Sequence, residues 1–342
     1  MEQKIKDAEQ WYDKNKTLYE QFSKEVEEII IKILKLKNIP YQSVSYRVKE
    51  KESYLNKCKN EKYTDPIKQI TDVAGIRIIA YTNQDVSSIC KILQDEFWID
   101  EDNSGNKAEM LETDKVGYLS VHYILQLSEN RLGLSENKLF ENLKCEVQVR
   151  TLLQHAWAEI EHDRSYKFAA KLPKEIERRF YLVAGVLELM DSEFDKLSKE
   201  IDEYDRSTKK AVSEGDYNLG IDSKSVEQYM LKKYEGVDNI HPSSGEIIVT
   251  EEVVEELVRF GYKKIQEIED DINSCMNAYE EEDTYLGLLR TLMMMKDCEK
   301  YFHVAYNGDW GSIEKSDVRF LKENGVENIE GYLNEYGIEL EE

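Results

Sequence analysis

Apolar positions recur with helical spacing through the first part of the chain. From Ile5 to Leu34 they stand mostly three or four residues apart, which predicts one or two amphipathic helices over residues 1–37. Asn38-Ile39-Pro40 ends the pattern, because proline cannot continue a helix.

Between residues 41 and 150 the pattern changes to short segments rich in β-branched and aromatic residues, which are typical of strands. The predicted strands cover 44–48, 74–81, 119–127 and 144–149, the predicted helices cover 51–58 and 84–97, and 100–115 is expected to be a loop. Strands that alternate with helices in this way predict an α/β fold with a mixed sheet and flanking helices.

From residue 152 onward the periodicity is almost entirely helical. A long helical stretch covers about 174–210, and a polar break with glycine follows at 213–223. Further helices are expected at 251–278, 284–306 and 313–324. We therefore expect N-terminal helices at 1–40, an α/β domain at 41–212 and an acidic, mostly α-helical domain at 225–342. We find no internal repeat.

The composition of the 342 residues, 41% hydrophobic and 34% charged, is that of a soluble globular protein. No segment has the roughly 20 consecutive apolar residues of a membrane helix, and the N-terminus lacks the apolar core of a signal peptide. We expect a cytoplasmic protein with no membrane contact.

The net charge of −24 is unevenly distributed, with −4 in residues 1–170 and −20 in residues 171–342. An acidic surface repels phosphate backbones, which argues against broad nucleic-acid binding. A local basic pocket in the first half is compatible with this distribution.

Two carboxylates stand at the starts of predicted strands. Asp72 precedes the second strand and its Gly75, and Glu146 begins the fourth. Mg²⁺ is commonly held by one or two carboxylates together with substrate phosphates. Each acid taken alone is more often an ordinary solvated or capping residue, but a nearby basic cluster favours a metal site.

The basic cluster consists of Arg47, Lys49 and Lys57. Arg47 and Lys49 are two positions apart on a predicted strand, so their side chains share one face, and Lys57 can turn back to it from the next helix. The alternative is a solvated edge strand that carries charge against aggregation.

Two further segments predict a polar wall with a period of two. Tyr118, which follows a glycine, can present its ring to a base, although a buried core position is the commoner outcome for a tyrosine. The alternating polar positions are Tyr118, Ser120 and His122 in one segment and Glu146, Gln148 and Arg150 in the other.

In order and spacing, these residues resemble the synthetase domain of the RelA/SpoT family. The matching segments are Tyr46-Arg-Val-Lys49 with Ser53 and Lys57, Asp72-Val-Ala-Gly-Ile-Arg77, Gly117-Tyr-Leu-Ser-Val-His122 and Glu146-Val-Gln-Val-Arg-Thr151. The continuation from His155 to His162 and Tyr166-Lys167 resembles the small alarmone synthetase branch. The resemblance covers about residues 40–167.

The resemblance implies a nucleotidyltransferase-like fold and an ATP-dependent pyrophosphokinase that makes (p)ppGpp from GDP or GTP. It implies that Asp72 and Glu146 are catalytic and hold Mg²⁺. It further implies an ATP site and an acceptor site. The ATP site would comprise Arg47, Lys49, Lys57 and Arg77, and the acceptor site Lys115, Tyr118, His122, Gln148 and Arg150.

Two alternatives remain open from the sequence. The same chemistry could modify the 3′ end of tRNA, as in toxic family members, some of which carry a C-terminal antitoxin-like extension. A catalytically inactive module that binds only nucleotides or a partner is the other alternative. The sequence leaves open a homo-oligomer and a trigger protein that binds the C-terminal domain.

Tyr332 and Tyr336 stand near the acidic C-terminus. One hypothesis is autoinhibition, in which acidic side chains imitate phosphate and a tyrosine ring imitates adenine in the ATP pocket. The alternative interpretation is that both rings pack in the core of their own domain.

Overall fold

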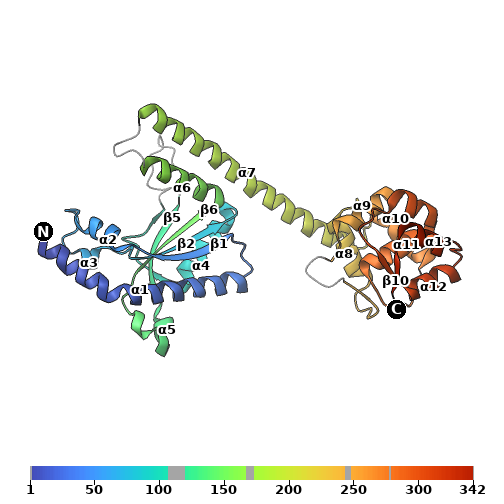
Figure 1. Cartoon of the computed structure of the whole chain (residues 1–342), viewed down its shortest axis with the longest axis horizontal. Helices are drawn as coiled ribbons and strands as arrows, with labels where there is room; N and C mark the ends of the chain where they lie inside the picture. Colours follow the sequence, from blue (N-terminus) through green and yellow to red (C-terminus); the bar gives the residue numbers. More distant parts are fainter. Residues whose placement is uncertain (1, 107–119, 167–172, 243–247, 277–278, 342) are drawn as a thin grey trace. The chain divides into compact units, whose positions relative to one another are not determined.

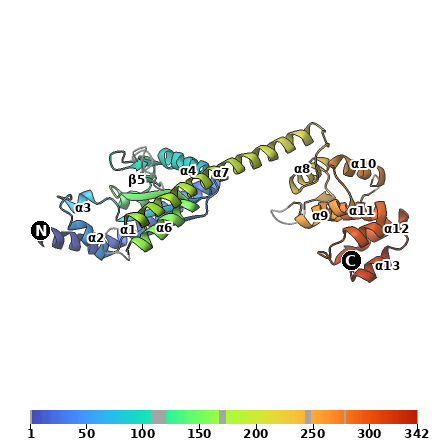
Figure 2. The same ribbon diagram turned by 90° about the horizontal axis from the view of Figure 1, so that it is seen from above.

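The chain forms two units, Met1–Ser198 and Lys199–Glu342, in a computed structural model that describes residues 2–106, 120–166, 173–242, 248–276 and 279–341 (Figure 1). The first unit is a sheet with helices on both sides, and the second is mostly helical (Figures 1 and 2). In the described ranges, no helix has the length and apolar character that a membrane crossing requires.

The sheet of the first unit has the strand order β1-β2-β6-β5-β3, with β4 paired to β5. Only the pairing of β2 with β6 is parallel, and the other pairs are antiparallel. The strands are β1 (Ser43–Val48), β2 (Ala74–Ala80), β3 (Phe97–Ile99), β4 (Gly105–Asn106), β5 (Val121–Leu127) and β6 (Cys145–Thr151).

The described helices of this unit are α1 (Glu2–Leu36), α2 (Lys51–Cys58), α3 (Pro66–Gln69), α4 (Asn83–Glu96), α5 (Glu129–Leu132), the 3₁₀ segment η1 (Ser135–Phe140), α6 (Leu152–Tyr166) and α7 (Lys174–Ser213). Thr82 caps α4 by accepting a hydrogen bond from the backbone N–H of Asp85, whose side chain accepts one from the backbone N–H of Thr82 in return. This reciprocal capping box explains why α4 begins directly after β2.

The two faces of the sheet differ because side chains alternate along each strand. Ile76 and Ile78 of β2 and Val147 and Val149 of β6 are buried on one face. They pack in one core with side chains of α1 and α4, including Phe22. The polar residues of β2 and β6 occupy the opposite face, and this division creates the candidate site.

The predicted fold class is confirmed: a mixed sheet with flanking helices is followed by a mainly helical region. The four predicted strands match β1, β2, β5 and β6, and the N-terminal pattern is the single helix α1. The strand β3 was not predicted: the helix expected at 84–97 ends at Glu96, and Phe97–Ile99 pair with β5 at the edge of the sheet. The sequence analysis also missed β4, which lies within the expected loop 100–115, most of which is outside the described residues.

The long helical stretch expected at 174–210 is α7, and the division between the units at Ser198 falls within this helix. The second unit contains α8 (Ser223–Lys233), α9 (Glu251–Phe260), α10 (Ile265–Cys275), α11 (Tyr285–Lys300), the π segment η2 (Tyr301–Ala305), α12 (Lys315–Glu323) and α13 (Ile329–Tyr336). Two short parallel pairs join β7 (Ile240–His241) to β8 (Asp283–Thr284), and β9 (Ser312–Glu314) to β10 (Glu339–Glu341).

One sequence pattern in the second unit becomes visible only with the structure. Three helices are followed by a glycine with positive φ and, four residues later, by a buried isoleucine. The pairs are Gly236 with Ile240, Gly261 with Ile265, and Gly325 with Ile329. Glycine adopts this left-handed conformation at helix ends at little cost, so these three helices end in a similar way.

Candidate active site

On the polar face of the sheet, residues of three neighbouring strands lie opposite one another. Arg47 of β1 lies opposite Gly75 of β2, which in turn lies opposite Glu146 of β6. Because Gly75 has no side chain, that of Arg47 lies across β2, and a Cβ built on Gly75 would be 3.5 Å from its Cγ. The resulting cleft is lined by Ser45, Tyr46, Arg47, Gly75, Ile76, Arg77, Glu146 and Gln148.

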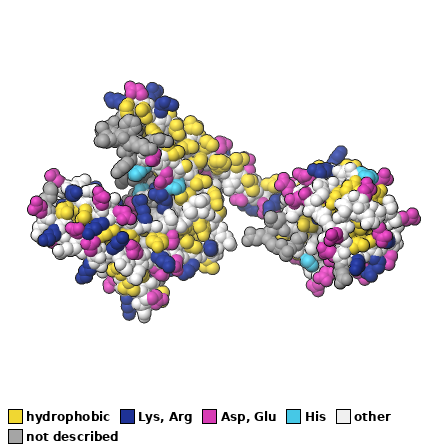
Figure 3. Space-filling model, viewed as in Figure 1, with side chains coloured by type: hydrophobic (Ala, Val, Ile, Leu, Met, Phe, Trp, Pro, Cys, Tyr) yellow, Lys and Arg dark blue, Asp and Glu magenta, His cyan; other side chains and the backbone are white. Residues whose placement is uncertain are grey.

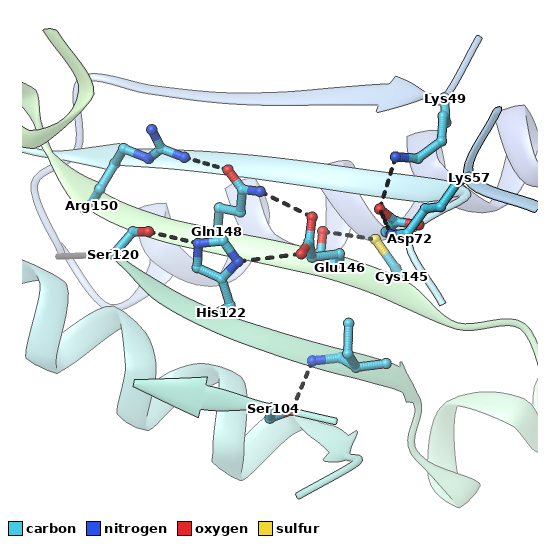
Figure 4. Close-up of polar contacts among 11 residues, drawn as sticks. Lys49, Lys57, Asp72, Ser104, Ser120, His122, Cys145, Glu146, Gln148 and Arg150 are labelled. Atoms are coloured by element: carbon cyan, nitrogen blue, oxygen red, sulfur yellow. Dashed lines mark hydrogen bonds and ion pairs between the residues drawn. The ribbon is translucent and has the colours of Figure 1, made fainter. Parts of the chain in front are cut away.

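Asp72, two residues before β2, is the meeting point of two lysines. Its Oδ2 atom is 2.8 Å from Nζ of Lys49 and 2.6 Å from Nζ of Lys57 (Figure 4). Burial lowers the pKa of Lys57, but the hydrogen bond and charge of Asp72 outweigh burial and raise it. Lys49 follows the end of β1 and Lys57 belongs to α2. The carboxylate of Asp72 therefore links the end of the strand to the helix.

Glu146 is the centre of a second polar cluster, shown in Figure 4. Its Oε1 is 3.3 Å from Nδ1 of His122, and its Oε2 accepts a 2.9 Å hydrogen bond from Nε2 of Gln148. The other ring nitrogen of His122 is 2.6 Å from Oγ of Ser120. The guanidinium of Arg150 donates a hydrogen bond to Oε1 of Gln148.

The surroundings of Glu146 favour its charged form. Burial raises the pKa of this carboxyl, but the hydrogen bonds with His122 and Gln148 and the charge of Lys57 outweigh burial and lower it to about 2. Glu146 is therefore anionic at neutral pH, close to the start of β6 just as Asp72 is close to the start of β2.

Helix α6 adds residues to which the sequence analysis assigned no role. Nη1 of Arg77 is 2.9 Å from Oε1 of Glu159, and Nδ1 of His155 is 3.7 Å from the same oxygen. The spacing of four residues between His155 and Glu159 placed them on one helix face. The sequence contained no signal for their contact with Arg77 on β2.

Arg150 lies near two other guanidinium groups, those of Arg77 and Arg47, and near the carboxylates of Glu159 and Glu146. Burial lowers the pKa of its guanidinium, and the nearby Arg77 and Arg47 lower it further. Its Nε atom is buried and has no hydrogen-bond partner. A group of mutually repelling guanidinium groups beside an open cleft is suited to a polyanion.

The carboxylates fit the Mg²⁺ site that the resemblance implies. Oδ1 of Asp72 is buried and has no hydrogen-bond partner, which is expected of an oxygen that binds a cation. No group of three or more metal-ligating side chains occurs in the described part of the chain. Two carboxylates suffice for Mg²⁺, because phosphate and water complete its coordination.

Four of the predicted residues do not belong to the described part of the first unit. Lys115 and Tyr118 lie outside the described residues. Tyr332 and Tyr336 belong to the second unit, where both rings stack on Phe302 with centroids 5.3 and 5.4 Å away. The hydroxyl of Tyr336 is also 2.9 Å from Nδ1 of His303, so both rings pack against the core of their own unit, which is the alternative interpretation.

Comparison with known proteins relates this geometry to a family. Residues 46–171 match a model of the region found in RelA/SpoT proteins. The chain is 30% identical over 169 residues to GTP pyrophosphokinase YwaC of Bacillus subtilis, covering 48% of this chain and 76% of that protein. The chain belongs to the RelA/SpoT family. It is thus an enzyme of the GTP pyrophosphokinase type, as the sequence motifs predicted.

Other similar proteins match a little over half of the chain. GTP pyrophosphokinase YjbM of Bacillus subtilis is 24% identical over 190 residues, which cover 52% of this chain and 85% of that protein. The solved structure of small alarmone synthetase 1 from Bacillus subtilis, bound to its product pppGpp, is 23% identical and has a TM-score of 0.48. The match covers 56% of this chain and 98% of that one. The solved structure of small alarmone synthetase 2 from the same organism is 25% identical and has a TM-score of 0.47. The match covers 55% of this chain and 99% of that one.

Proposed function

We propose that this enzyme transfers the β,γ-pyrophosphate of ATP to the 3′-hydroxyl of GDP or GTP. The observation that carries the proposal is the polar side of the sheet, where Asp72 and Glu146 stand near the starts of two neighbouring strands. Asp72 pairs with Lys49 and Lys57, and Glu146 lines a cleft together with Arg47 and Arg77. The curated relatives YwaC and YjbM, which are named GTP pyrophosphokinases, support the same reaction.

The donor binds, in this proposal, along the β1–β2 side of the cleft. Arg47 and Arg77 contact the phosphates of ATP, and Lys49 and Lys57 neutralise the charge that develops on the transferred group. Arg77 then exchanges its ion pair with Glu159 for phosphate oxygens. Such a cluster acts mainly by positioning and by electrostatic stabilisation, which are the main requirements of phosphoryl transfer.

Asp72 and Glu146 would hold Mg²⁺, which would offset the negative charge of the phosphates. The low pKa of Glu146 suits this role, because a carboxylate that stays ionised is a good metal ligand. The same low pKa makes it a weak proton acceptor, so we assign Glu146 to the metal in preference to deprotonation of the hydroxyl.

The acceptor binds on the β5–β6 side. Gln148, Arg150, His122 and Lys115 position it, and Tyr118 stacks on its base. The 3′-oxygen forms a bond to the β-phosphorus of ATP, the bond from that phosphorus to the α,β-bridging oxygen breaks, and AMP leaves with that oxygen. The hydroxyl proton passes to solvent.

A second acceptor, the 3′ end of tRNA, is favoured by one observation. YwaC and YjbM match only 48% and 52% of this chain, so the chain carries a helical unit beyond the part they match, as toxic family members with extensions do. The acidity of the second half opposes tRNA binding there, which is why we place the free nucleotide first.

The test is incubation of the full chain with γ-labelled ATP and, separately, GDP, GTP and total tRNA. We expect label in the guanosine nucleotide and one equivalent of AMP for each transfer. Label in tRNA alone would establish the alternative acceptor. Absence of AMP with every acceptor, in a folded protein, would support the inactive binding module.

A further inference from the structure

Glu159 of α6 is paired with an arginine that lines the cleft. Its Oε1 lies 2.9 Å from Nη1 of Arg77 and 3.7 Å from Nδ1 of His155. On the face drawn in Figure 3, Lys and Arg side chains gather beside histidines where α6 meets the sheet. The side chain of Glu159 is 53% exposed and that of Arg77 is 27% exposed, so water reaches this ion pair.

The position of Glu159 is fixed by its helix and does not depend on the ion pair. At the start of α6, the backbone N–H of Gln154 donates to Oγ1 of Thr151 at 3.1 Å, and the backbone N–H of Thr151 donates to Oε1 of Gln154 at 2.9 Å. This is a reciprocal capping box. Further along the helix, Nε1 of Trp157 donates a 3.3 Å hydrogen bond to the backbone oxygen of Phe180. Glu159 therefore stays beside the sheet when its ion pair opens.

The carboxylate of Glu159 acts on several basic groups at once. Burial lowers the pKa of the Arg150 guanidinium and Arg77 lowers it further, whereas Glu159 raises it. Burial and Arg77 also lower the pKa of His155, and Glu159 again raises it. Glu159 thus favours the charged forms of these groups, as a bound anion would.

Asp72 and Glu159 both pair with cations of the site, but they differ in exposure. The side chain of Asp72 is 14% exposed, and its Oδ2 contacts Lys49 and Lys57 together. Glu159 is far more exposed. An ion pair that water reaches is weak, whereas a nucleoside triphosphate brings several negative charges to the same guanidinium. Glu159 is therefore the acid that a phosphate displaces.

We propose that Glu159 is a specificity-determining residue that competes with the phosphates of ATP for Arg77. In the free enzyme it holds the guanidinium, and ATP displaces it. After transfer it recaptures Arg77 from the single phosphate of AMP, which favours release of this product. A guanidinium binds carboxylate and phosphate with the same fork of N–H donors, so the two anions compete for it. The inference rests on the proposed function, in which Arg77 binds the phosphates of ATP.

ATP binding by the full chain, measured with Mg²⁺ and without an acceptor, tests the competition. Glu159→Gln removes the charge and keeps the shape, so it is expected to tighten ATP binding about two- to fivefold. The control is Glu20→Gln, which removes the same charge from an acid that is 47% exposed and pairs with Lys16. It is expected to bind ATP as the wild type does. Weaker binding in Glu159→Gln would mean that Glu159 aligns Arg77 for the phosphates, and this result or unchanged binding overturns the proposal.

A double-mutant cycle tests whether the effect passes through Arg77. In the background Arg77→Met, which keeps the aliphatic part of the side chain, Glu159→Gln is expected to leave ATP affinity unchanged, because the contested guanidinium is gone. The same gain in both backgrounds would indicate a general effect of charge and overturn the proposal. If Arg77→Met binds ATP too weakly to measure, Arg77→Lys is the second background. It keeps a charge but loses the fork, so a smaller gain than in the wild type is expected there, and an equal gain overturns the proposal.

AMP binding tests the role in product release. Glu159→Gln is expected to bind AMP about two- to fivefold more tightly than the wild type, and equal affinities overturn this role. Transfer to GDP is measured on the same samples. A wild type that binds ATP but transfers nothing to GDP contradicts the proposed reaction, and the binding comparison still decides the competition at Arg77. A wild type that binds no ATP overturns both.

Discussion

The ammonium group of Lys57 lies 2.6 Å from Oδ2 of Asp72, while Oδ1 of the same carboxylate is buried without a partner. One oxygen is thus held by two lysines of the protein, and the other has no partner in the protein. This asymmetry explains how a carboxylate that is paired with lysines can still bind a metal ion.

Asp72→Asn is expected to lower pyrophosphate transfer by at least about 10²-fold, because it removes charge from the metal site and releases both lysines. Glu146→Gln is expected to have a similar effect. AMP release from ATP measures both. Asp95→Asn, an exposed acid on α4, serves as the control. Activity within about tenfold of the wild type in either variant would remove the metal assignment.

Tyr118→Ala is expected to raise the KM of the guanosine nucleotide by about 5- to 100-fold and to leave that of ATP nearly unchanged, since a stacked base contributes about 1–3 kcal/mol. Tyr118→Phe keeps a ring and is expected to resemble the wild type. An equal rise in both Michaelis constants would indicate that Tyr118 supports the fold instead of the acceptor.

Gly75 tests the path of the Arg47 side chain across β2. A Cβ at this position makes an ordinary contact of 3.5 Å, so Gly75→Ala is expected to retain activity. Gly75→Leu displaces the guanidinium and is expected to raise the KM of ATP about 10- to 100-fold, the loss of one charge-assisted hydrogen bond. If Gly75→Leu binds ATP normally, Arg47 has another route to the phosphates or no contact with them.

The second unit contains an acid pair that predicts a pH dependence of stability. The hydroxyl of Tyr279 is 2.8 Å from Oδ2 of Asp283 and 2.5 Å from Oδ1 of Asp317. A hydroxyl has one proton to donate, so one carboxyl must supply the other. Burial, with the nearby Asp317, raises the pKa of Asp283 to about 7.

For an acid with a raised pKa, the folded chain binds more protons than the unfolded chain. Its contribution to stability is therefore complete below the unfolded pKa near 4 and is lost as pH rises through 7. Asp283→Asn imitates the protonated acid and is expected to reduce this loss. Asp317, whose pKa burial also raises, keeps its own smaller share. Thermal unfolding at pH 5 and pH 8 measures it. A variant whose melting temperature falls as steeply as that of the wild type would contradict the assignment.

Local patterns in the sequence determined the alternation along each strand. Val147 and Val149 had to face away from Glu146, Gln148 and Arg150, because side chains alternate across a strand whatever its neighbours are. The spacing of motif residues also determined the family, and the four main strands and α1 followed from periodicity. These properties depend on residues close together in the chain, so they can be read without the fold.

The tertiary structure alone decided which of these faces meet. The register that places Arg47, Gly75 and Glu146 in one row joins three strands distant in sequence, and the ion pair between Arg77 and Glu159 depends on where α6 packs. The short strand β3 could not be predicted either. Three residues show too little periodicity, and an edge strand forms only with its partner. Which strands pair depends on how well the whole core is buried. Local periodicity does not contain this information.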